Sequence, residues 1–397
     1  MFSDRTNWRL AQNRFTQAVE EVRARGGKIL DLTASNPTRV GLEYDVAGIL
    51  GAFSSRGSLD YDPQAKGLES ARKAVSGYYR ELCGGKGIDP EQIVLTTSTS
   101  EGYSYVFRLL CNAGDELLVP KPSYPLFEFL ADLQDVKLVP YPLIYDHGWQ
   151  IDFPSMESAV TARTRGVVVV HPNNPTGSYV HMSEMGQLNE FCRAHRLALI
   201  VDEVFLDYGL DHGLDHMGGS LRSSSFVSNQ EVLTFTLSGL SKVSALPQMK
   251  VAWVVTSGPD DVVATAMARF EVIADTYLSM NAPVQWAVPV MLEQRKSIQP
   301  QLMERVRENL AELDRQLAEQ SACERLDVEG GWYAVLRVPV TRSDEDLAIE
   351  LVRKESVVVH PGHFYDFPRD GYLVLSLITA KDDFANGLKR VLHCLNP

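Results

Sequence analysis

The feature that most constrains the fold is a series of short apolar runs that alternate with helical patterns. The runs VVVV, LALIV and VAWVV hold no charged residue, as is expected of strands covered on both faces. Strands that alternate with helices predict an α/β fold with a large, mostly parallel sheet flanked by helices and right-handed crossovers. Such sheets bind ligands at the carboxyl ends of their strands.

The length and the change of pattern along the chain predict more than one domain. The chain has 397 residues, which exceeds an ordinary single domain. After about Pro259 long helical stretches lead into short strands. We therefore expect an N-terminal arm that joins the smaller domain (residues 1–40), a large domain (41–275) and a smaller α+β domain (276–397). A periodic apolar pattern predicts a first helix from Asn7 to Arg25.

Charge and cysteine content exclude several classes of protein. With 38 basic and 51 acidic side chains the formal charge is −13, which argues against nucleic acid or an anionic membrane as a partner. A run of about 18 apolar residues, as a membrane span needs, does not occur, and the polar N-terminus does not resemble a signal peptide. The five scattered cysteines predict reduced thiols in a cytoplasmic protein, with neither disulfides nor a metal site.

The segment from Thr234 to Val255 places one lysine between two strand-like runs. TFTLS precedes it, VAWVV follows it, and the connecting loop is polar, so Lys242 is expected at a strand end. Low-dielectric surroundings there would lower its pKa and leave a nucleophilic amine, which suits a Schiff base with an aldehyde cofactor. The alternative is an ordinary solvated lysine, and the polar residues at other strand ends favour the catalytic interpretation.

Two further strand ends carry groups that suit a flat, anionic ligand. The Ser98-Thr99-Ser100 turn enters a helix, where hydroxyls, backbone N–H groups and the helix dipole can bind a small anion. The same turn could serve only as a helix cap. Tyr124, in KPSYPLF, could stack on a heterocycle or simply belong to the core.

Asn174 and Asp202 end two of the apolar strands. The Asn174 amide can donate to a ring oxygen, although an Asn-Pro turn alone would also explain it. Asp202 ends LALIVD, so its carboxylate would be buried and would need a cationic partner. A protonated pyridine nitrogen is such a partner, and the pair would keep the ring an electron sink.

The segments YDPQAKGLESAR, STSEG, PSYPLF, NNPTG, VDEV, LSK and PG…GYLVLS follow one another along the chain. In this order and spacing the chain resembles the fold type I pyridoxal-phosphate enzymes of the class I/II aminotransferase family over nearly its whole length. The resemblance implies an aminotransferase that moves an amino group between an amino acid and a 2-oxo acid, with pyridoxal 5'-phosphate as cofactor. It also implies a homodimer with shared active sites.

The resemblance assigns roles to residues of this chain. It gives Lys242 the Schiff base and the proton transfer at the substrate α-carbon, and it places Tyr61 at the phosphate of the partner subunit's site. The cofactor contacts that it implies are Tyr61, Ser98, Thr99, Ser100, Tyr124, Asn174, Asp202, Phe205, Ser241 and Lys250.

Three positions near the cofactor depart from the family pattern. Phe205 replaces a common tyrosine, and the lost hydroxyl should raise the Schiff-base pKa and shift the pH optimum. Lys250 replaces an arginine, so a point charge substitutes for a two-pronged phosphate contact. Gly239 lacks a hydroxyl that is often present. Phosphate binding is still expected through Ser100, Lys250 and Ser241.

The departure with the largest consequence is Val374, which occupies the position of the family's arginine for the substrate α-carboxylate. Arg369 and Arg39 are the candidate replacements, with Asn36 beside Arg39 as a further substrate contact, although either arginine would ordinarily be a surface residue. Because Val374 replaces the family's carboxylate-binding arginine, a lyase, decarboxylase or oxidase with the same cofactor remains an alternative. A ligand-binding or regulatory module is a third hypothesis, and the sequence does not identify the substrate.

Overall fold

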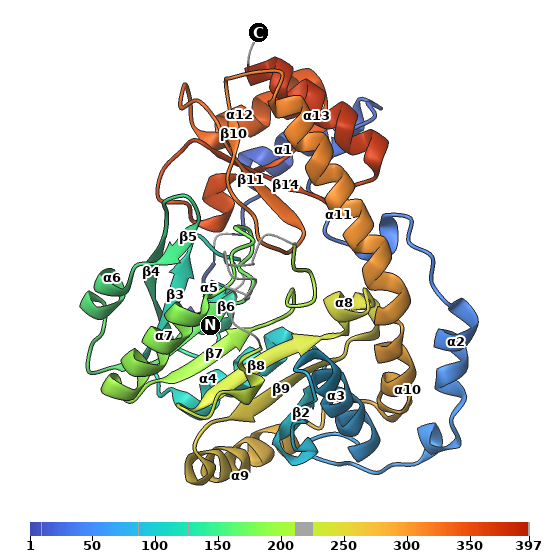
Figure 1. The fold of residues 1–397 in the computed structure, drawn as a ribbon, viewed down its shortest axis with the longest axis vertical. Helices are drawn as coiled ribbons and strands as arrows, with labels where there is room; N and C mark the ends of the chain where they lie inside the picture. The colour runs from blue at the N-terminus through green and yellow to red at the C-terminus, as the bar shows by residue number, and fades with distance from the viewer. Residues whose placement is uncertain (9, 86, 126, 211–224, 396–397) are drawn as a thin grey trace.

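A computed structural model describes residues 1–8, 10–85, 87–125, 127–210 and 225–395, and its centre is an eight-stranded sheet (Figure 1). Across the sheet the strands are β2 (Ile93–Thr96), β9 (Ala252–Ser257), β8 (Thr234–Gly239), β7 (Ala198–Asp202), β6 (Thr164–Val170), β3 (Glu116–Lys121), β4 (Lys137–Tyr145) and β5 (Trp149–Ile151). β9 runs antiparallel to both of its neighbours and β5 antiparallel to β4, while the other pairs are parallel. The expected mostly parallel α/β sheet is confirmed.

Helices cover both faces of this sheet. They are α3 (Glu69–Leu82), α4 (Thr99–Leu110), α5 (Phe127–Asp132), α6 (Phe153–Ser158), α7 (Met182–His195), α9 (Asp260–Tyr277) and α10 (Ala282–Glu293). Val168 and Val170 pack in one core with α4 and α9, whereas Val167 and Val169 pack in another with α7. Successive strand residues point to opposite faces, so a sheet covered on both sides explains the uninterrupted apolar runs.

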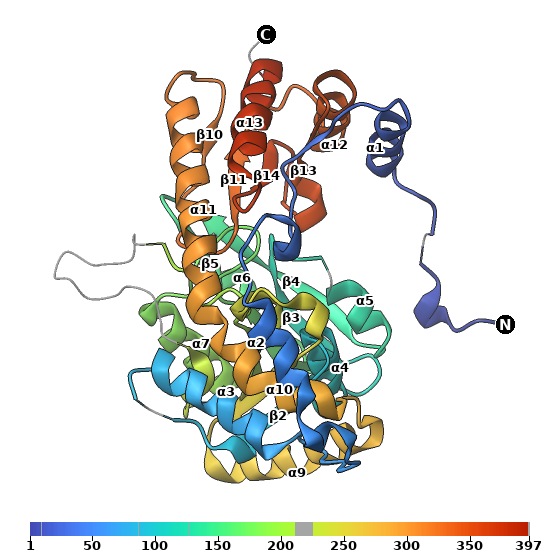
Figure 2. The same ribbon diagram turned by 90° about the vertical axis from the view of Figure 1, so that its right-hand side faces the viewer.

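A second, four-stranded antiparallel sheet lies above the first in Figure 1. Its strands are β10 (Glu324–Arg325), β11 (Tyr333–Arg337), β14 (Tyr372–Ser376) and β13 (His360–Pro361), in that order. Around it lie α1 (Arg14–Ala24), α11 (Arg295–Leu317), α12 (Asp344–Glu350), α13 (Lys381–Leu395) and the parallel pair β1 (Leu30–Asp31) and β12 (Val357–Val358). The long α11 links the two parts (Figures 1 and 2), while α2 (Val46–Gly51) flanks α10.

The N-terminal segment bridges these two parts differently from the sequence expectation. Helix α1 begins at Arg14, after the Asn13 side chain accepts a hydrogen bond from the Thr16 N–H, so the expected start at Asn7 is wrong. Trp8 instead donates through Nε1 to Asp132, 2.7 Å away, and packs edge-on against Phe129 of α5.

Within the described ranges, none of the helices has the length and apolarity that crossing a membrane requires.

Helix α10 packs with the large sheet. Ala287, Val288, Met291 and Leu292 share a core with Trp253 of β9, and α10 also contacts α3. Residues 282–293 were expected in the smaller domain, but their apolar face is buried against the larger part.

Candidate active site

A cavity of about 420 Å³ lies at the carboxyl ends of β6, β7 and β8, with residues of the second sheet on its other side. It brings together nine of the residues that the sequence singled out: Ser98, Thr99, Ser100, Tyr124, Asn174, Asp202, Phe205, Ser241 and Lys242. Ser98 and Lys242 are 144 positions apart in the chain and meet at this cavity. They meet because the carboxyl ends of the parallel strands lie at the same edge of the sheet.

Lys242 lies on α8 (Leu240–Val243), directly after the last residue of β8. Its Nζ is 4.6 Å from the centre of the Trp332 ring and 5.4 Å from that of Phe205. The surrounding protein lowers the pKa of the amine to about 8, and the charge of Asp202 opposes this shift. About one tenth of the amine is therefore unprotonated at pH 7, far more than for an ordinary lysine, and the unprotonated form is the one that a nucleophile or general base requires.

Asp202 ends β7 and lines the same cavity. Its carboxylate accepts hydrogen bonds from the Tyr103 hydroxyl at 3.0 Å and the Val204 N–H at 3.1 Å. Burial raises its pKa to about 6, although these two donors and the Lys242 charge favour the ionised form. A cation that binds next to this carboxylate would be stabilised because the site itself disfavours an unpaired negative charge.

The neighbouring Glu203 has a separate role in the structure. It is buried, and its carboxylate accepts from the Ser225 hydroxyl and the Phe226 N–H, both at 2.6 Å. Burial raises its pKa to about 8. Of the two consecutive acids, Asp202 therefore faces the cavity and Glu203 anchors the chain after the 211–224 segment.

Asn174, Tyr124 and Phe205 provide the remaining flat and polar surfaces. Asn174 is buried, and its Oδ1 has no hydrogen-bond partner among the described residues. A buried amide oxygen without a partner costs free energy, so a ligand group that donates a hydrogen bond to Oδ1 would be favoured, while the side-chain NH2 is the group that can donate to a ring oxygen. Phe205 packs edge-on against Trp332, with 5.2 Å between ring centres, which holds the aromatic wall in place.

The start of α4 combines the two interpretations of the Ser98-Thr99-Ser100 turn. Ser98 caps the helix, because its hydroxyl accepts from the Glu101 N–H at 3.2 Å. All three residues nevertheless line the cavity, and the first-turn N–H groups of a helix favour anions. The turn is thus both a cap and a candidate phosphate site.

The structure explains the departure at Gly239, the last residue of β8. A Cβ atom there would lie 2.8 Å from the Val251 carbonyl oxygen and 2.9 Å from the Ala252 Cβ. These contacts are too close, and one of them is to backbone. A serine would therefore require β8 and β9 to separate.

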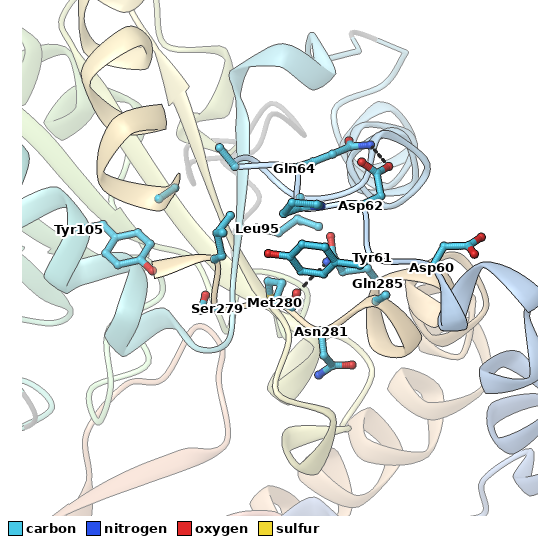
Figure 3. Close-up of a pocket in the computed structure, with 16 residues that line it drawn as sticks. Asp60, Tyr61, Asp62, Gln64, Leu95, Tyr105, Ser279, Met280, Asn281 and Gln285 are labelled. Carbon is cyan, nitrogen blue, oxygen red and sulfur yellow. Dashed lines mark hydrogen bonds between the residues drawn. The ribbon is translucent and has the colours of Figure 1, made fainter. Parts of the chain in front are cut away.

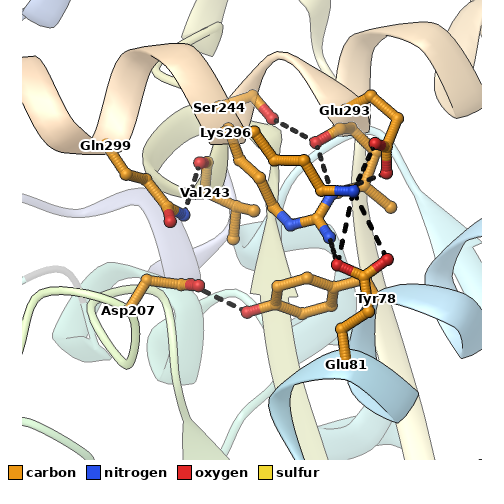
Figure 4. Close-up of polar contacts among 10 residues, drawn as sticks. Tyr78, Glu81, Asp207, Val243, Ser244, Glu293, Lys296 and Gln299 are labelled. Atoms are coloured by element: carbon orange, nitrogen blue, oxygen red, sulfur yellow. Dashed lines mark hydrogen bonds and ion pairs between the residues drawn. The ribbon is translucent and has the colours of Figure 1, made fainter.

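Side chains of three distant segments donate hydrogen bonds to the backbone at and after Lys242. The Tyr208 hydroxyl donates to the Lys242 carbonyl at 2.6 Å, the Gln299 amide to Val243 at 2.9 Å and the Tyr44 hydroxyl to Ala245 at 2.9 Å. Figure 4 shows the Gln299 contact next to a hydrogen bond between Tyr78 and Asp207. Because these carbonyls are fixed by side-chain donors, the backbone that carries the amine has a defined position at the cavity.

Five predicted residues lie outside this cavity. Tyr61 is 87% exposed and lines a separate hollow of about 280 Å³ between residues 60–67 and 278–285 (Figure 3). Lys250, Arg39 and Arg369 are exposed and do not line the catalytic cavity. Asn36 is exposed, and its side chain accepts from the N–H and the hydroxyl of Thr38 as a cap for residues 37–39.

Several residues that the sequence analysis did not identify also line the cavity: Ser35, Tyr103, Tyr333, His360 and Tyr365. His360 does follow a short apolar run, as Asn174 and Asp202 do, so its position at a strand was a usable signal. Ser35 and Tyr333 carried no such signal, because only the packing of the second sheet brings them to the cavity.

These residues fit pyridoxal phosphate. The cavity holds a buried carboxylate for the ring nitrogen, an amide that can donate to a ring oxygen, an amine of lowered pKa for the aldehyde and a helix start for the phosphate. The fold and this set of groups are those of an enzyme that works on amino groups through a carbonyl cofactor.

Comparison with known proteins identifies the family. The family model for class I and II aminotransferases matches residues 44–382, and the chain belongs to this family. It is an enzyme that transfers amino groups, and members of this family depend on pyridoxal phosphate. The resemblance noted in the sequence is thereby confirmed.

Relatives from several organisms align over most of the chain. The alanine aminotransferase of Mycobacterium tuberculosis is 27% identical, covering 94% of this chain and 87% of its own. The glutamate-pyruvate aminotransferase AlaA of Escherichia coli is 26% identical, covering 94% and 91%. Among solved structures, the alanine aminotransferase of Pyrococcus furiosus superposes with a TM-score of 0.87 at 21% identity, covering 98% of both chains, which supports the fold.

Proposed function

We propose that this aminotransferase forms its covalent link to pyridoxal phosphate through Lys242 and moves an amino group between an amino acid and a 2-oxo acid. The observation that carries the proposal is the cavity in which the Lys242 amine, with its pKa lowered to about 8, shares the strand ends with the buried Asp202 carboxylate.

Each residue then has a defined task. When bound, the cofactor supplies an aldehyde for the amine and a ring that withdraws electrons from the substrate α-carbon. Asp202 would hold the ring nitrogen in its protonated form, the Asn174 amide would donate to the ring oxygen, and Tyr124 would stack on the ring. Phe205 would lie where relatives have a tyrosine hydroxyl at the ring oxygen. Ser98, Thr99, Ser100 and Ser241 would hold the phosphate, and Lys250, which lies outside the cavity lining, would have to approach to act as a further cation. Lys242 Nζ, once free of the cofactor, would take the proton from the α-carbon and deliver it to the cofactor.

The names of two relatives support a proposal for the substrate class. Two of them act as alanine or glutamate-pyruvate aminotransferases by name, so we propose a small amino donor, with pyruvate or 2-oxoglutarate as the other partner. Arg39, Arg369 and Asn36 remain proposed substrate contacts that would need to approach the cavity when substrate binds.

Borohydride reduction of the purified holoenzyme, followed by peptide mass spectrometry, tests the cofactor link. We expect the cofactor mass on Lys242 and a new 2-oxo acid when amino donors are added with pyruvate. Release of carbon dioxide or hydrogen peroxide instead would favour the lyase, decarboxylase or oxidase alternative. A protein that binds no cofactor would refute the proposal.

We also propose a homodimer in which Tyr61 reaches the phosphate of the partner subunit's site. Exposed apolar side chains around Tyr61 support this, among them Leu59, Leu278 and Trp286. Mixing Tyr61→Phe subunits with Lys242→Ala subunits tests it, because shared sites let a mixed dimer form one intact site. Recovery of activity on mixing is expected; a monomer by sedimentation, or no recovery, would contradict it.

The proposed domains are an arm over residues 1–40, a large cofactor-binding domain over 41–275 and a small domain over the C-terminal residues. Because α10 packs with the large sheet, the boundary between the last two falls better within α11 than at residue 276. We place the enzyme in the cytoplasm, with the five free cysteines as support.

A further inference from the structure

We propose that His360, held by Tyr365, receives the substrate carboxylate in place of the arginine that position 374 lacks, and that it takes up a proton as it does so. The inference rests on the proposed aminotransferase function and names a contact which that function leaves open.

The position of His360 in the second sheet supports this role. His360 of β13 pairs directly with Val374 of β14, and side chains of directly paired residues lie on the same face of a sheet. Val374 is 1% exposed and has no polar atom in its side chain. His360 lines the cavity that holds Lys242. Val374 pairs with an apolar residue, Val335, on one side and with His360 on the other, so the polar partner of the family's arginine position is a histidine that lines the cavity.

The contact with Tyr365 orients the imidazole. Nδ1 of His360 lies 3.0 Å from the Tyr365 hydroxyl, which also lines the cavity. When this hydroxyl donates to Nδ1, the neutral ring carries its proton on Nε2 and can donate it to a ligand. The ring of Phe364 packs at 5.9 Å from the imidazole and restricts its rotation.

The charge balance of the cavity requires such a donor. Among the described residues that line it, Lys242 is the sole lysine or arginine, and the cofactor link would engage its amine. A carboxylate in a buried site is unfavourable without a cation or strong donors. Burial lowers the pKa of His360 to about 4, while Asp31 raises it. The free residue is therefore neutral near pH 7, and an arriving carboxylate favours its protonated form.

Other ionisable groups around His360 do not replace this function. Asp31 accepts from the N–H and hydroxyl of Thr33, and Asp344 accepts from the N–H groups of Gly371 and Tyr372. The titratable and charged groups on the elements that pack against His360 or face it across the cavity are Asp31, Tyr124, Asp202, Lys242, Tyr333, Asp344, Glu345, Asp346, Glu350, His363, Tyr365 and Tyr372.

The test uses holoenzyme and propanoate, a carboxylate that has no amine and cannot react. Calorimetry in two buffers of different ionisation enthalpy measures the protons taken up on binding. We expect His360→Asn to take up about one proton per site fewer than the unmodified enzyme at pH 7, and to bind propanoate at least about tenfold more weakly. Its affinity should also vary less between pH 8 and pH 6 than that of the unmodified enzyme.

Matched variants keep the inference falsifiable. His363→Asn alters an exposed histidine three residues away and should leave proton uptake unchanged. Tyr365→Phe removes one hydroxyl and should weaken propanoate binding less than His360→Asn does. In transfer assays His360→Asn should raise KM for amino acids more than it lowers kcat. For the matching amines without a carboxylate, KM should stay unchanged.

The failure of this inference can be distinguished from that of the proposed function. If the unmodified enzyme transfers amino groups but His360→Asn binds propanoate with the same affinity and proton uptake, the inference is wrong. Loss of affinity in Arg369→Ala or Arg39→Ala, with His360→Asn unaffected, would also overturn it. If the enzyme holds no cofactor on Lys242, the proposed function itself fails. The cofactor absorption band and thermal unfolding of each variant report whether it is folded.

Discussion

The two sides of the catalytic cavity are built in different ways. On the side of the large sheet, Asp202 and Lys242 follow neighbouring strands, with an acid and an amine facing one space. On the other side, Ser35, Tyr333 and His360 come from three distant segments and are neutral near pH 7 or uncharged. The first side carries the groups proposed for amino transfer, whereas the second side holds no lysine, arginine, aspartate or glutamate among its described lining residues.

The groups proposed for the reaction and the groups proposed for the substrate therefore come from different parts of the fold. The side of the large sheet carries Lys242, Asp202 and Asn174, the groups proposed for the cofactor chemistry, while Phe205 and Lys250 depart from the family pattern. The side facing the substrate has lost its arginine at Val374 without gaining another within the lining. The cavity therefore supports the relatives' type of reaction for this chain more directly than it supports their substrates.

The largest effect is expected at Lys242. Lys242→Ala removes both the amine that links the cofactor and the base at the α-carbon, so turnover should fall by at least about 10³-fold. Lys389→Ala, at an exposed lysine, is the matched control and should retain activity. The measurement is 2-oxo acid production under saturating cofactor. Turnover that survived in Lys242→Ala would remove the distinction between the two sides.

The second-largest effect is expected for Asp202→Asn. Turnover should fall by about 10²-fold to 10³-fold because a fixed charge that supports the transition state is lost. The substituted amide retains the size of the carboxylate, so KM should change little. A comparable loss of kcat in Ser35→Ala would mean that the second side also carries chemistry.

Asp202 should also limit the stability of the cofactor-free protein. Because its pKa is raised to about 6, its contribution to stability is fully present below the unfolded pKa and is lost as the pH rises through about 6. Asp202→Asn should therefore raise the free energy of unfolding by roughly 3 kcal/mol near pH 7 and leave it unchanged near pH 3. Urea unfolding at the two pH values measures this difference. Equal effects at both values would contradict the pKa argument.

The smallest effect is expected from the side chains that donate hydrogen bonds to the backbone at and after Lys242. Tyr208→Phe removes the donor to the Lys242 carbonyl, which should lower the free energy of unfolding by about 1 to 3 kcal/mol. Turnover should fall only several-fold, because Gln299 and Tyr44 still hold the following carbonyls. A 10²-fold loss of turnover would show that this contact positions the amine and does more than stabilise the fold.

Particular residues show why prediction from the sequence succeeded on one side and not on the other. Lys242, Asp202 and Asn174 each follow an apolar strand of a single parallel sheet, so a local pattern was enough to bring them together. Lys250 and Arg369 also stand near strand ends, yet their side chains are exposed and do not line the cavity. Sequence periodicity reports the end of a strand but does not report the direction of a side chain in the loop beyond it.

The amino-acid sequence by itself determined the large sheet and the positions of Lys242 and Asp202 at strand ends that share one cavity. The physical reason is that apolar runs and their polar ends are local properties of the chain, and parallel strands align those ends at one edge. Tertiary structure alone decided which groups line the second side of the cavity. The pairing of His360 with Val374 and the arrival of Ser35 depend on contacts between distant segments, and no local pattern encodes that register.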